Sequence, residues 1–407
     1  MSNFSFMTKL LDGVKIQWIP LGTVTQYEQP TKYLVKTKNY DDGFKTPVLT
    51  AGKTFVLGYT NEIDGINKAS KKPVIIFDDF TTANKWVDFD FKAKSSAMKM
   101  IKCSDESKFI LKYVYYWMNT LPSDLVDGDH KRQWISNFCK KKIPIPCPEN
   151  PKKSLEIQED IVRILDTFTE LTTELTTELS ARKKQYNYYR DQLLSFDEEG
   201  VEWKTLPEVA FDFGRGKSKH RPRNDERLYG GDIPFIQTGD IRSASHFITQ
   251  YTQTYSELGL KQSKLWPKGT LCITIAANIA ETSILGFDAC FPDSVIGFVA
   301  DPKKTSAGYV EYLLQSTKNK LEEKGREKSS AQSNINLATF KQLQLPFPTL
   351  AEQERIASTL DKFDTITSSI SEGLPREIKL RQQQYEYYRD LLLSFPKSGE
   401  AELKEGA

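Results

Sequence analysis

The stretch QYNYYRDQLLSF at residues 185–196 returns as QYEYYRDLLLSF at residues 384–395, with ten of the twelve positions identical. Upstream of each copy, a Gln-Glu pair is followed by spaced Ile, Leu-Asp and Phe positions, at 158–168 and at 353–363. Chance does not produce so extended a match. The chain therefore contains two similar units.

The repeated framework continues upstream in both units. IPIP at 143–146 is echoed by LPFP at 345–348, and GVKIQWIPL at 13–21 resembles GVEWKTL at 200–206, with the Trp-to-Leu spacing kept. The blocks between these markers show no comparable similarity, so we interpret the chain as two copies of one framework carrying two different modules. The predicted domains are a first module (1–150), a central spacer helix (151–199), a second module (200–348), a C-terminal spacer helix (349–396) and a disordered tail (397–407).

The repeated tails predict long helices, because their apolar residues recur at spacings of three and four, as in a heptad seam. About 41 residues from Glu156 to Phe196, at ~1.5 Å each, give a rod of roughly 60 Å. One amphipathic rod cannot bury its seam alone, so we expect the two rods to pack antiparallel with one module at each end. Gly373 and Pro375 predict a kink or a short break in the second rod.

The first rod carries seven acids and one base, Arg163, between Glu156 and Ala181. DNA would repel such a surface, and another protein is a better partner for it. A plain structural coiled coil is the alternative. The predicted seam and partner-binding residues are Ile161, Leu165, Phe168, Leu171, Leu175, Leu179, Tyr186, Tyr189, Arg190, Ile356, Leu360, Phe363, Tyr385, Tyr388 and Arg389.

Both modules alternate short apolar runs with turn residues and end in a helical stretch, which is typical of mixed α/β structure. The expected fold class is α+β: two mixed α/β modules separated by two long antiparallel helices, in a pseudo-two-fold, circular arrangement. Strands are expected at 47–49, 55–57, 73–77, 98–101, 233–236, 270–275 and 294–299, and helices near 109–119 and 309–324.

Both modules also contain basic segments interspersed with amides. Lys and Arg bind phosphate, whereas Arg, Asn and Gln read base edges through paired hydrogen bonds. A solvated surface loop is the alternative for any one segment. The predicted DNA-binding residues of the first module are Gln29, Lys32, Thr82, Asn84, Lys85, His130, Lys131, Arg132 and Gln133. Those of the second module are Arg215, Lys217, Lys219, Arg221, Arg223, Gln237, Arg242, Lys328, Gln332 and Asn334.

Composition and missing motifs argue against other classes of protein. The longest apolar run, 271–280, is about half of what a membrane helix needs, and the N-terminus lacks a secretory apolar region. Five cysteines without a CxxC pair argue against disulfides and zinc and fit a reducing cytoplasm. GKS at 216–218 and GKT at 52–54 lack the earlier glycine of a phosphate-binding loop. The three histidines and the Asp78-Asp79 pair are interpreted as structural residues.

Taken together, the proline runs, the Gln-Glu helices and the Tyr-Tyr-Arg-Asp tails resemble the specificity subunit of a type I restriction–modification enzyme. The Thr-Glu-Leu repeats between 169 and 179 make the chain similar to the C subfamily. The resemblance implies that the modules are target-recognition domains, each reading one half of a split, asymmetric site on double-stranded DNA. It also implies that the spacer helices set the gap between the halves and bind two modification subunits.

The resemblance assigns the chemistry to the partner subunits. The modification subunits hold S-adenosylmethionine and methylate adenine, and a restriction and translocase subunit uses ATP and Mg²⁺. This chain is then non-catalytic and binds no cofactor or metal. The alternatives are a scaffold whose two variable heads bind proteins, and a self-sufficient enzyme, which predicts activity from the purified chain alone.

Overall fold

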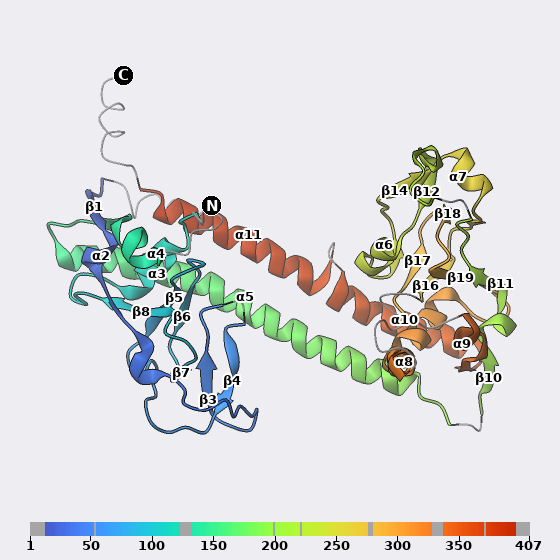
Figure 1. Ribbon diagram of the computed structural model, residues 1–407, viewed down its shortest axis with the longest axis horizontal. Coiled ribbons are helices and arrows are strands. Elements are labelled where there is room, and N and C mark those ends of the chain that lie inside the picture. The colour runs from blue at the N-terminus through green and yellow to red at the C-terminus, as the bar shows by residue number, and fades with distance from the viewer. Residues whose placement is uncertain are drawn as a thin grey trace, which may run out of the picture. The chain divides into compact units, whose positions relative to one another are not determined.

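The computed structural model describes residues 13–52, 54–122, 132–197, 200–219, 222–275, 280–327, 337–369 and 372–395. The chain divides into two compact units (Figure 1). Unit 1 consists of Met1–Thr173 with Leu380–Ala407, and unit 2 of Glu174–Lys379. Each unit therefore contains one module and segments of both repeated tails. The predicted tail at 397–407 lies outside the described residues.

The module of unit 1 is mixed α/β, as expected. Its elements are β1 (Ile16–Pro20), α2 (Leu21–Val24), β2 (Thr25–Glu28), η1 (Pro30–Tyr33), β3 (Thr46–Leu49), β4 (Val56–Thr60), β5 (Val74–Asp78), β6 (Asn84–Val87), β7 (Lys92–Ala93), β8 (Met98–Cys103), α3 (Leu111–Met118), α4 (Gln133–Ser136), η2 (Phe138–Lys140) and β9 (Lys142–Pro146). They form a four-stranded sheet in the order β2-β8-β5-β6, a three-stranded sheet β4-β3-β7 and the pair β1-β9.

Strand β5 shows why this module folds around one sheet. Ile75 and Phe77 belong to a core cluster shared with α3, whereas Val74 and Ile76 belong to a second cluster on the opposite face. Successive side chains of a strand point to opposite faces, so a strand covered on both sides needs a continuous apolar run. The apolar run at 73–77 is therefore a central strand.

The module of unit 2 has its own set of elements. They are β10 (Glu202–Thr205), η3 (Leu206–Val209), β11 (Ala210–Arg215), η4 (Glu226–Leu228), β12 (Tyr229–Phe235), α6 (Thr238–Ser243), β13 (Phe247–Ile248), β14 (Gln253–Tyr255), α7 (Glu257–Lys261), β15 (Leu265–Trp266), β16 (Leu271–Thr274), β17 (Thr282–Leu285), β18 (Ala289–Cys290), β19 (Val295–Ala300), α8 (Ala307–Glu327), α9 (Leu337–Gln342) and β20 (Gln344–Phe347). The sheets are β11-β19-β16-β17-β13, β14-β12-β18-β15 and the pair β10-β20.

The two modules share a framework that their sequences do not reveal. The order β2-β8-β5-β6 in unit 1 corresponds to β11-β19-β16-β17 in unit 2, and neighbouring strands within each set are antiparallel. Ser104 N donates to Val24 O at 3.0 Å, and Asp301 N donates to Val209 O at the same distance. These matching bonds show which residues of the two sheets correspond to each other.

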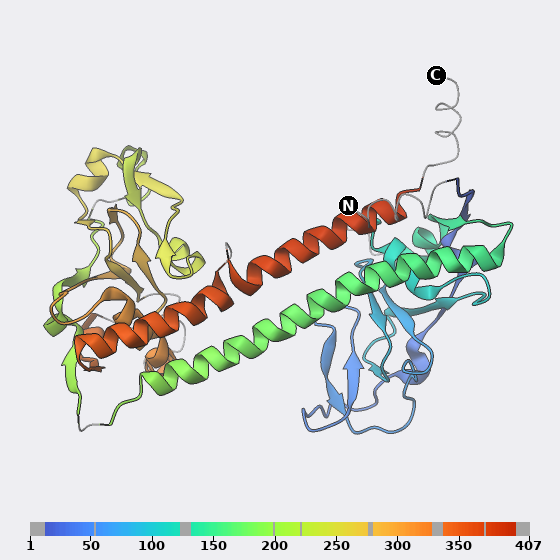
Figure 2. The same cartoon turned by 180° about the vertical axis from the view of Figure 1, so that it is seen from behind.

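The repeated tails are helical, as predicted. α5 (Pro151–Leu193) is one helix of 43 residues, and the second tail forms α10 (Leu350–Ser368) and α11 (Gly373–Leu393). The expected break at Gly373 is confirmed: this residue has a φ of +73°, and a Cβ there would lie 2.4 Å from Thr365 O. Within unit 1, the end of α11 lies antiparallel beside the start of α5 (Figures 1 and 2).

Candidate nucleic-acid interface and its helical support

The proline run of unit 1 is a strand that pairs with the strand carrying the repeated tryptophan. In the β1-β9 register Trp18 lies opposite Pro144. The hydroxyl of Tyr113, on α3, donates to Pro144 O at 2.7 Å and thereby connects α3 to this strand pair. Two parts of the repeated framework that are far apart in the sequence therefore form one joint.

The repeated glutamine and aspartate of α5 complete this joint. Gln158 Nε2 donates to Lys108 O at 3.0 Å, and its Oε1 accepts from Ile110 N at 2.9 Å. Asp166 accepts from the Tyr116 hydroxyl through Oδ1 and from Lys112 Nζ at 2.8 Å through Oδ2. Both Gln158 and Asp166 therefore connect α5 with α3 or with the loop before α3.

Unit 2 repeats the joint with its own residues. Tyr309 donates to Pro346 O at 3.1 Å, and Tyr312 donates to Asp361 Oδ1 at 2.6 Å. Gln353 Nε2 donates to Lys304 O at 3.0 Å. Burial, followed by the bond to the carboxylate, raises the pKa of the Tyr312 phenol, as it does in the equivalent phenol of unit 1. The tyrosines therefore stay neutral donors.

These tyrosines form a repeat that sequence analysis missed. YVYY at 113–116 corresponds to YVEY at 309–312, at the same place in the joint. The motif is short, and its distance to the proline run differs between the units, so it does not stand out in a comparison of the two blocks. A search for tyrosines spaced by three residues upstream of each proline run would have found it.

Several predicted seam residues make contacts between the two tail segments that belong to the same unit. Phe168 stacks on Tyr388 with ring centroids 5.1 Å apart in unit 1, and Tyr189 stacks on Phe363 at 5.9 Å in unit 2. Four of the aliphatic seam residues are fully buried: Ile161, Leu165, Ile356 and Leu360. Leu171, Leu175 and Leu179, in the Thr-Glu-Leu repeats, are only half-buried.

The twelve-residue repeat makes the same internal contacts in both copies. Arg190 lies over the ring of Tyr186 at 5.6 Å, and Arg389 lies over that of Tyr385 at 5.8 Å. Burial raises the pKa of Tyr385 to about 12. The middle tyrosine of each copy, by contrast, points outward: Tyr188 is 62% exposed and Tyr387 is 55% exposed. Two large exposed aromatic side chains at repeated positions are available for a partner.

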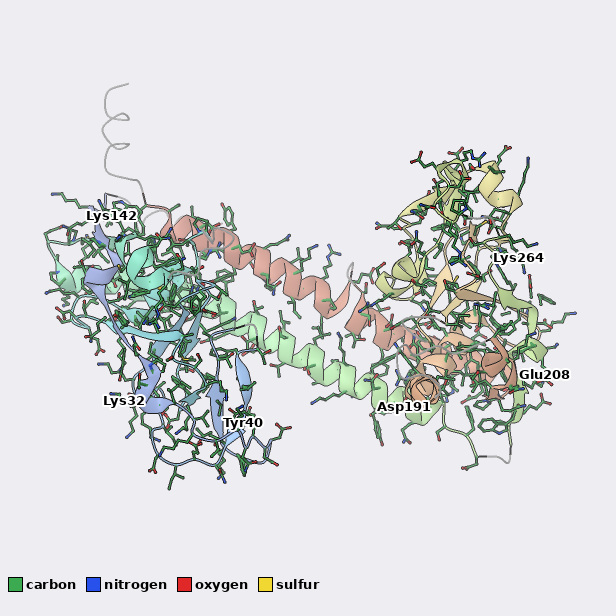
Figure 3. The ribbon with its side chains drawn as sticks, viewed as in Figure 1. Lys32, Tyr40, Lys142, Asp191, Glu208 and Lys264 are labelled. Carbon is green, nitrogen blue, oxygen red and sulfur yellow. The ribbon has the colours of Figure 1, made fainter. Side chains whose placement is uncertain are left out.

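The predicted DNA-binding residues of the first module fall into two groups. Those with exposed side chains are Gln29, Lys32, Lys85 and Arg132. Thr82, at a φ of +60° in the β5-β6 turn, and Gln133, at the start of α4, are buried, and Asn84 is half-buried. Lys32, labelled in Figure 3, forms an ion pair with Glu28 at 2.6 Å. His130 and Lys131 lie outside the described residues.

In the second module, one aspartate holds two of the predicted arginines. Arg223 binds both carboxylate oxygens of Asp293, at 2.9 and 3.0 Å, and Arg215 Nε donates to Asp293 O at 2.5 Å. Lys217, Lys219 and Arg242 are exposed. Arg221, Lys328, Gln332 and Asn334 lie outside the described residues. In the described part of this basic loop (215–219 and 222–223), Asp293 therefore anchors both arginines, and the two lysines between them in the sequence are exposed.

A cleft of about 670 Å³ lies beside this loop and contains two predicted residues, Arg223 and Gln237. Phe235, Tyr229 and Pro292 supply apolar surface to it. Gln253, also in the lining, accepts a hydrogen bond from Gln237 Nε2 and was not predicted. A single exposed glutamine on β14 gives no sequence signal. The pair places an oriented amide in the cleft, the group that reads adenine edges.

A third feature of this module is a buried acid–base pair. His246 Nδ1 and Glu311 Oε2 are 2.5 Å apart, and Glu311 is fully buried. Burial raises the pKa of Glu311. Burial acts to lower the pKa of His246, but the bond to Glu311 and the negative charges of Glu311, Asp361 and Asp364 together outweigh it and raise that pKa. The pair supports the interpretation of this histidine as a structural residue.

The described residues offer no group of three or more His, Cys, Asp or Glu side chains that could hold a metal ion. In the same residues, no helix is both long and apolar enough to cross a membrane. The five cysteines are free thiols, four of them buried. The features that remain as candidates for function are the joints, the basic loops and the cleft.

These observations define a class of protein in which repeated helices hold two different mixed α/β modules through equivalent tyrosine, aspartate and glutamine hydrogen bonds. A family model described as the type I restriction modification DNA specificity domain matches residues 15–183 and 198–380. The chain belongs to this family of specificity subunits and, as such, is non-catalytic.

Individual relatives agree with this assignment. The chain is 53% identical over 406 residues to the Escherichia coli type I restriction enzyme EcoR124I/EcoR124II specificity subunit, covering 98% of both chains. It is 31% identical over 407 residues to the E. coli EcoprrI specificity subunit, covering 91% of this chain and 93% of the relative. Its fold resembles the crystal structure of a Mycoplasma genitalium type I S subunit, with a TM-score of 0.59, 15% identity, and 95% and 98% of the chains covered.

Proposed function

We propose that this chain selects the DNA sites of a type I restriction–modification complex, and that each module reads one half of a bipartite, asymmetric site. The observation that carries the proposal is the duplicated joint: in both units the repeated Asp and the proline run accept hydrogen bonds from tyrosines of α3 or α8, and the repeated Gln bonds to the loop before that helix. A protein that recognises a two-part DNA site needs a constant support that holds two variable modules. The cleft and the basic loop of the second module supply amides for bases and cations for phosphates.

We propose that α5, α10 and α11 set the unread gap between the half-sites and bind two modification subunits. The exposed Tyr188 and Tyr387 support this, because the same residue is exposed at the same place in both repeats. The acids of the first tail, from Glu156 to Glu178, favour a protein partner over DNA on this surface. We expect the restriction and translocase subunits to join through the modification subunits.

The chemistry then belongs to the partners. S-adenosylmethionine is expected in the modification subunits, and ATP and Mg²⁺ in the restriction and translocase subunits. We expect this chain to supply the DNA specificity and to bind none of these three groups. Its place of action is the cytoplasm, where the DNA is.

The decisive experiment is single-molecule methylation sequencing of a host that expresses the full complex. The expected result is a two-part methylation motif with a fixed gap. Replacing residues 207–344 with another such block should change one half-site only. A control in purified complex is the salt dependence of duplex binding, which should be steep because phosphate contacts release counterions. A one-part motif, or a swap that alters both halves, would contradict the proposal.

A further inference from the structure

Module 1 buries an ion pair in its core. Lys99 Nζ lies 3.4 Å from Asp79 Oδ2, and the two side chains are 0% and 1% exposed. Within the described part of the chain, neither of these two atoms has a hydrogen-bond partner. Removing two charges from water is costly, and the mutual attraction often fails to repay the cost. A buried pair of this kind therefore needs an explanation beyond stability.

The second module shows which side chains the fold itself requires there. In the β5-β8 ladder Phe77 lies opposite Lys99, and in the β16-β19 ladder Ile273 lies opposite Ile296. These ladders occupy the same place in the two shared sheets. Lys99 therefore corresponds to Ile296, which is fully buried.

The next bonds of the two ladders give the equivalent of Asp79. Asp79 N donates to Ala97 O, and Ile275 N donates to Ser294 O, in each case one residue past the last ladder pair. Asp79 therefore corresponds to Ile275, which is 4% exposed and lies in the same core cluster as Ile296. The shared framework accepts two isoleucines at these positions, so it does not require the charges.

Asp79 makes two contacts that an isoleucine could not fully replace. Its backbone oxygen accepts from Gln133 N at 2.8 Å, and its side-chain Oδ1 accepts from Trp134 N at 3.0 Å. These bonds hold the start of α4, directly after the exposed Arg132. Lys99 attracts the other carboxylate oxygen, so Oδ1 stays directed at Trp134.

We propose that Asp79 and Lys99 are positioning residues that hold the start of α4, and with it the exposed Arg132, in place for reading the first half-site. The inference rests on the proposed function of module 1. An isoleucine at position 79 would leave Trp134 N without its carboxylate acceptor, and α4 would lose one of its two bonds to the β5-β6 turn. The core would survive, but the reading segment would move.

The test compares two double variants that both remove the charges. Asp79→Ile with Lys99→Ile copies module 2 and lacks the side-chain acceptor. Asp79→Asn with Lys99→Met keeps an acceptor oxygen for Trp134 N. Each is expressed with the modification subunits, its thermal unfolding is measured, and its methylation motif is sequenced. Both should fold. The isoleucine pair should lose about tenfold or more of its discrimination at the first half-site, the scale of a mis-set base contact.

The asparagine–methionine pair should keep that discrimination to within about threefold, and the second half-site should be unchanged in both. Equal discrimination by the two folded variants, whether kept or lost, would overturn the inference. If the isoleucine pair does not fold, Asp79→Ala with Lys99→Met replaces it, because it differs from the asparagine variant only at position 79, where the carboxamide that carries the acceptor is missing. A wild-type complex without a two-part motif would instead refute the proposed function, so the two failures are distinguishable.

Discussion

Shortening α5 tests whether the helix sets the spacing of the two half-sites. The deletion removes Thr172–Leu175, one Thr-Thr-Glu-Leu unit from a helix of 43 residues. Four residues at ~1.5 Å each shorten the helix by about 6 Å and rotate its C-terminal part by about 40° beyond a full turn. DNA rises ~3.4 Å per base pair along one strand. We therefore expect the gap to shrink by one or two base pairs.

The deletion should leave the modules themselves intact, because the joint residues Gln158 and Asp166 precede it and those of unit 2 lie beyond it in the chain. The assay is methylation sequencing of a host expressing the variant with its partner subunits. The matched control replaces Thr172 and Thr173 by alanine, which keeps the length of the helix while removing both hydroxyls, which donate to Phe168 O and Thr169 O. An unchanged gap in an active deletion variant would refute the proposal that the length of α5 sets the spacing of the half-sites.

Three further perturbations address the joint, the partner surface and a charged pair. Asp361→Ala removes the acceptor of a buried tyrosine hydroxyl and should destabilise unit 2 by about 1–3 kcal/mol in denaturant unfolding. Replacing Tyr188 and Tyr387 by alanine should weaken binding of the modification subunits at least tenfold in titration calorimetry, since exposed tyrosines are frequent hot spots. Burial acts to raise the pKa of Glu62, but hydrogen bonds from Lys92 and two backbone N–H groups lower it to about 2. The stability that Glu62 adds, measured as the difference in Tm from Glu62→Gln, should be full above about pH 4.5 and fade as the pH falls toward 2.

Each of these predictions has a control. Asp361→Asn retains an acceptor and should lose less stability than the alanine variant, and equal losses would argue against the hydrogen bond. Phe247→Ala removes an exposed aromatic ring from the second module and should leave subunit binding unchanged. A Tm difference for Glu62→Gln that does not change with pH would show that packing, rather than charge, accounts for the effect.

The sequence predicted the elements that depend on local pattern. The run at 73–77, the helix near 109–119 and the break at Gly373 all lie where expected, because apolar periodicity and glycine chemistry act over a few residues. Residues brought together by topology were not predictable. Gln253 meets Gln237 across two elements, and the equivalence of Lys99 with Ile296 exists only in the sheet register.

The candidate reading residues were predicted by type, and their accessibility depended on packing. Lys85 and Arg132 are exposed, whereas Thr82 and Gln133 are buried by the turn and helix that carry them. A polar side chain in a turn gives no sign of whether it faces solvent or the core. Side-chain type alone therefore nominates a reading surface but does not choose its members.

The duplicated joint also has an evolutionary consequence. In each unit one tyrosine of α3 or α8 donates to the repeated Asp, the other donates to the proline run, and the repeated Gln bonds to the loop before that helix. A segment acquired by recombination within the flanking repeats would arrive with its attachment already matched. New DNA specificities could then be acquired by exchanging whole modules between genes, without stepwise change in the rest of the enzyme.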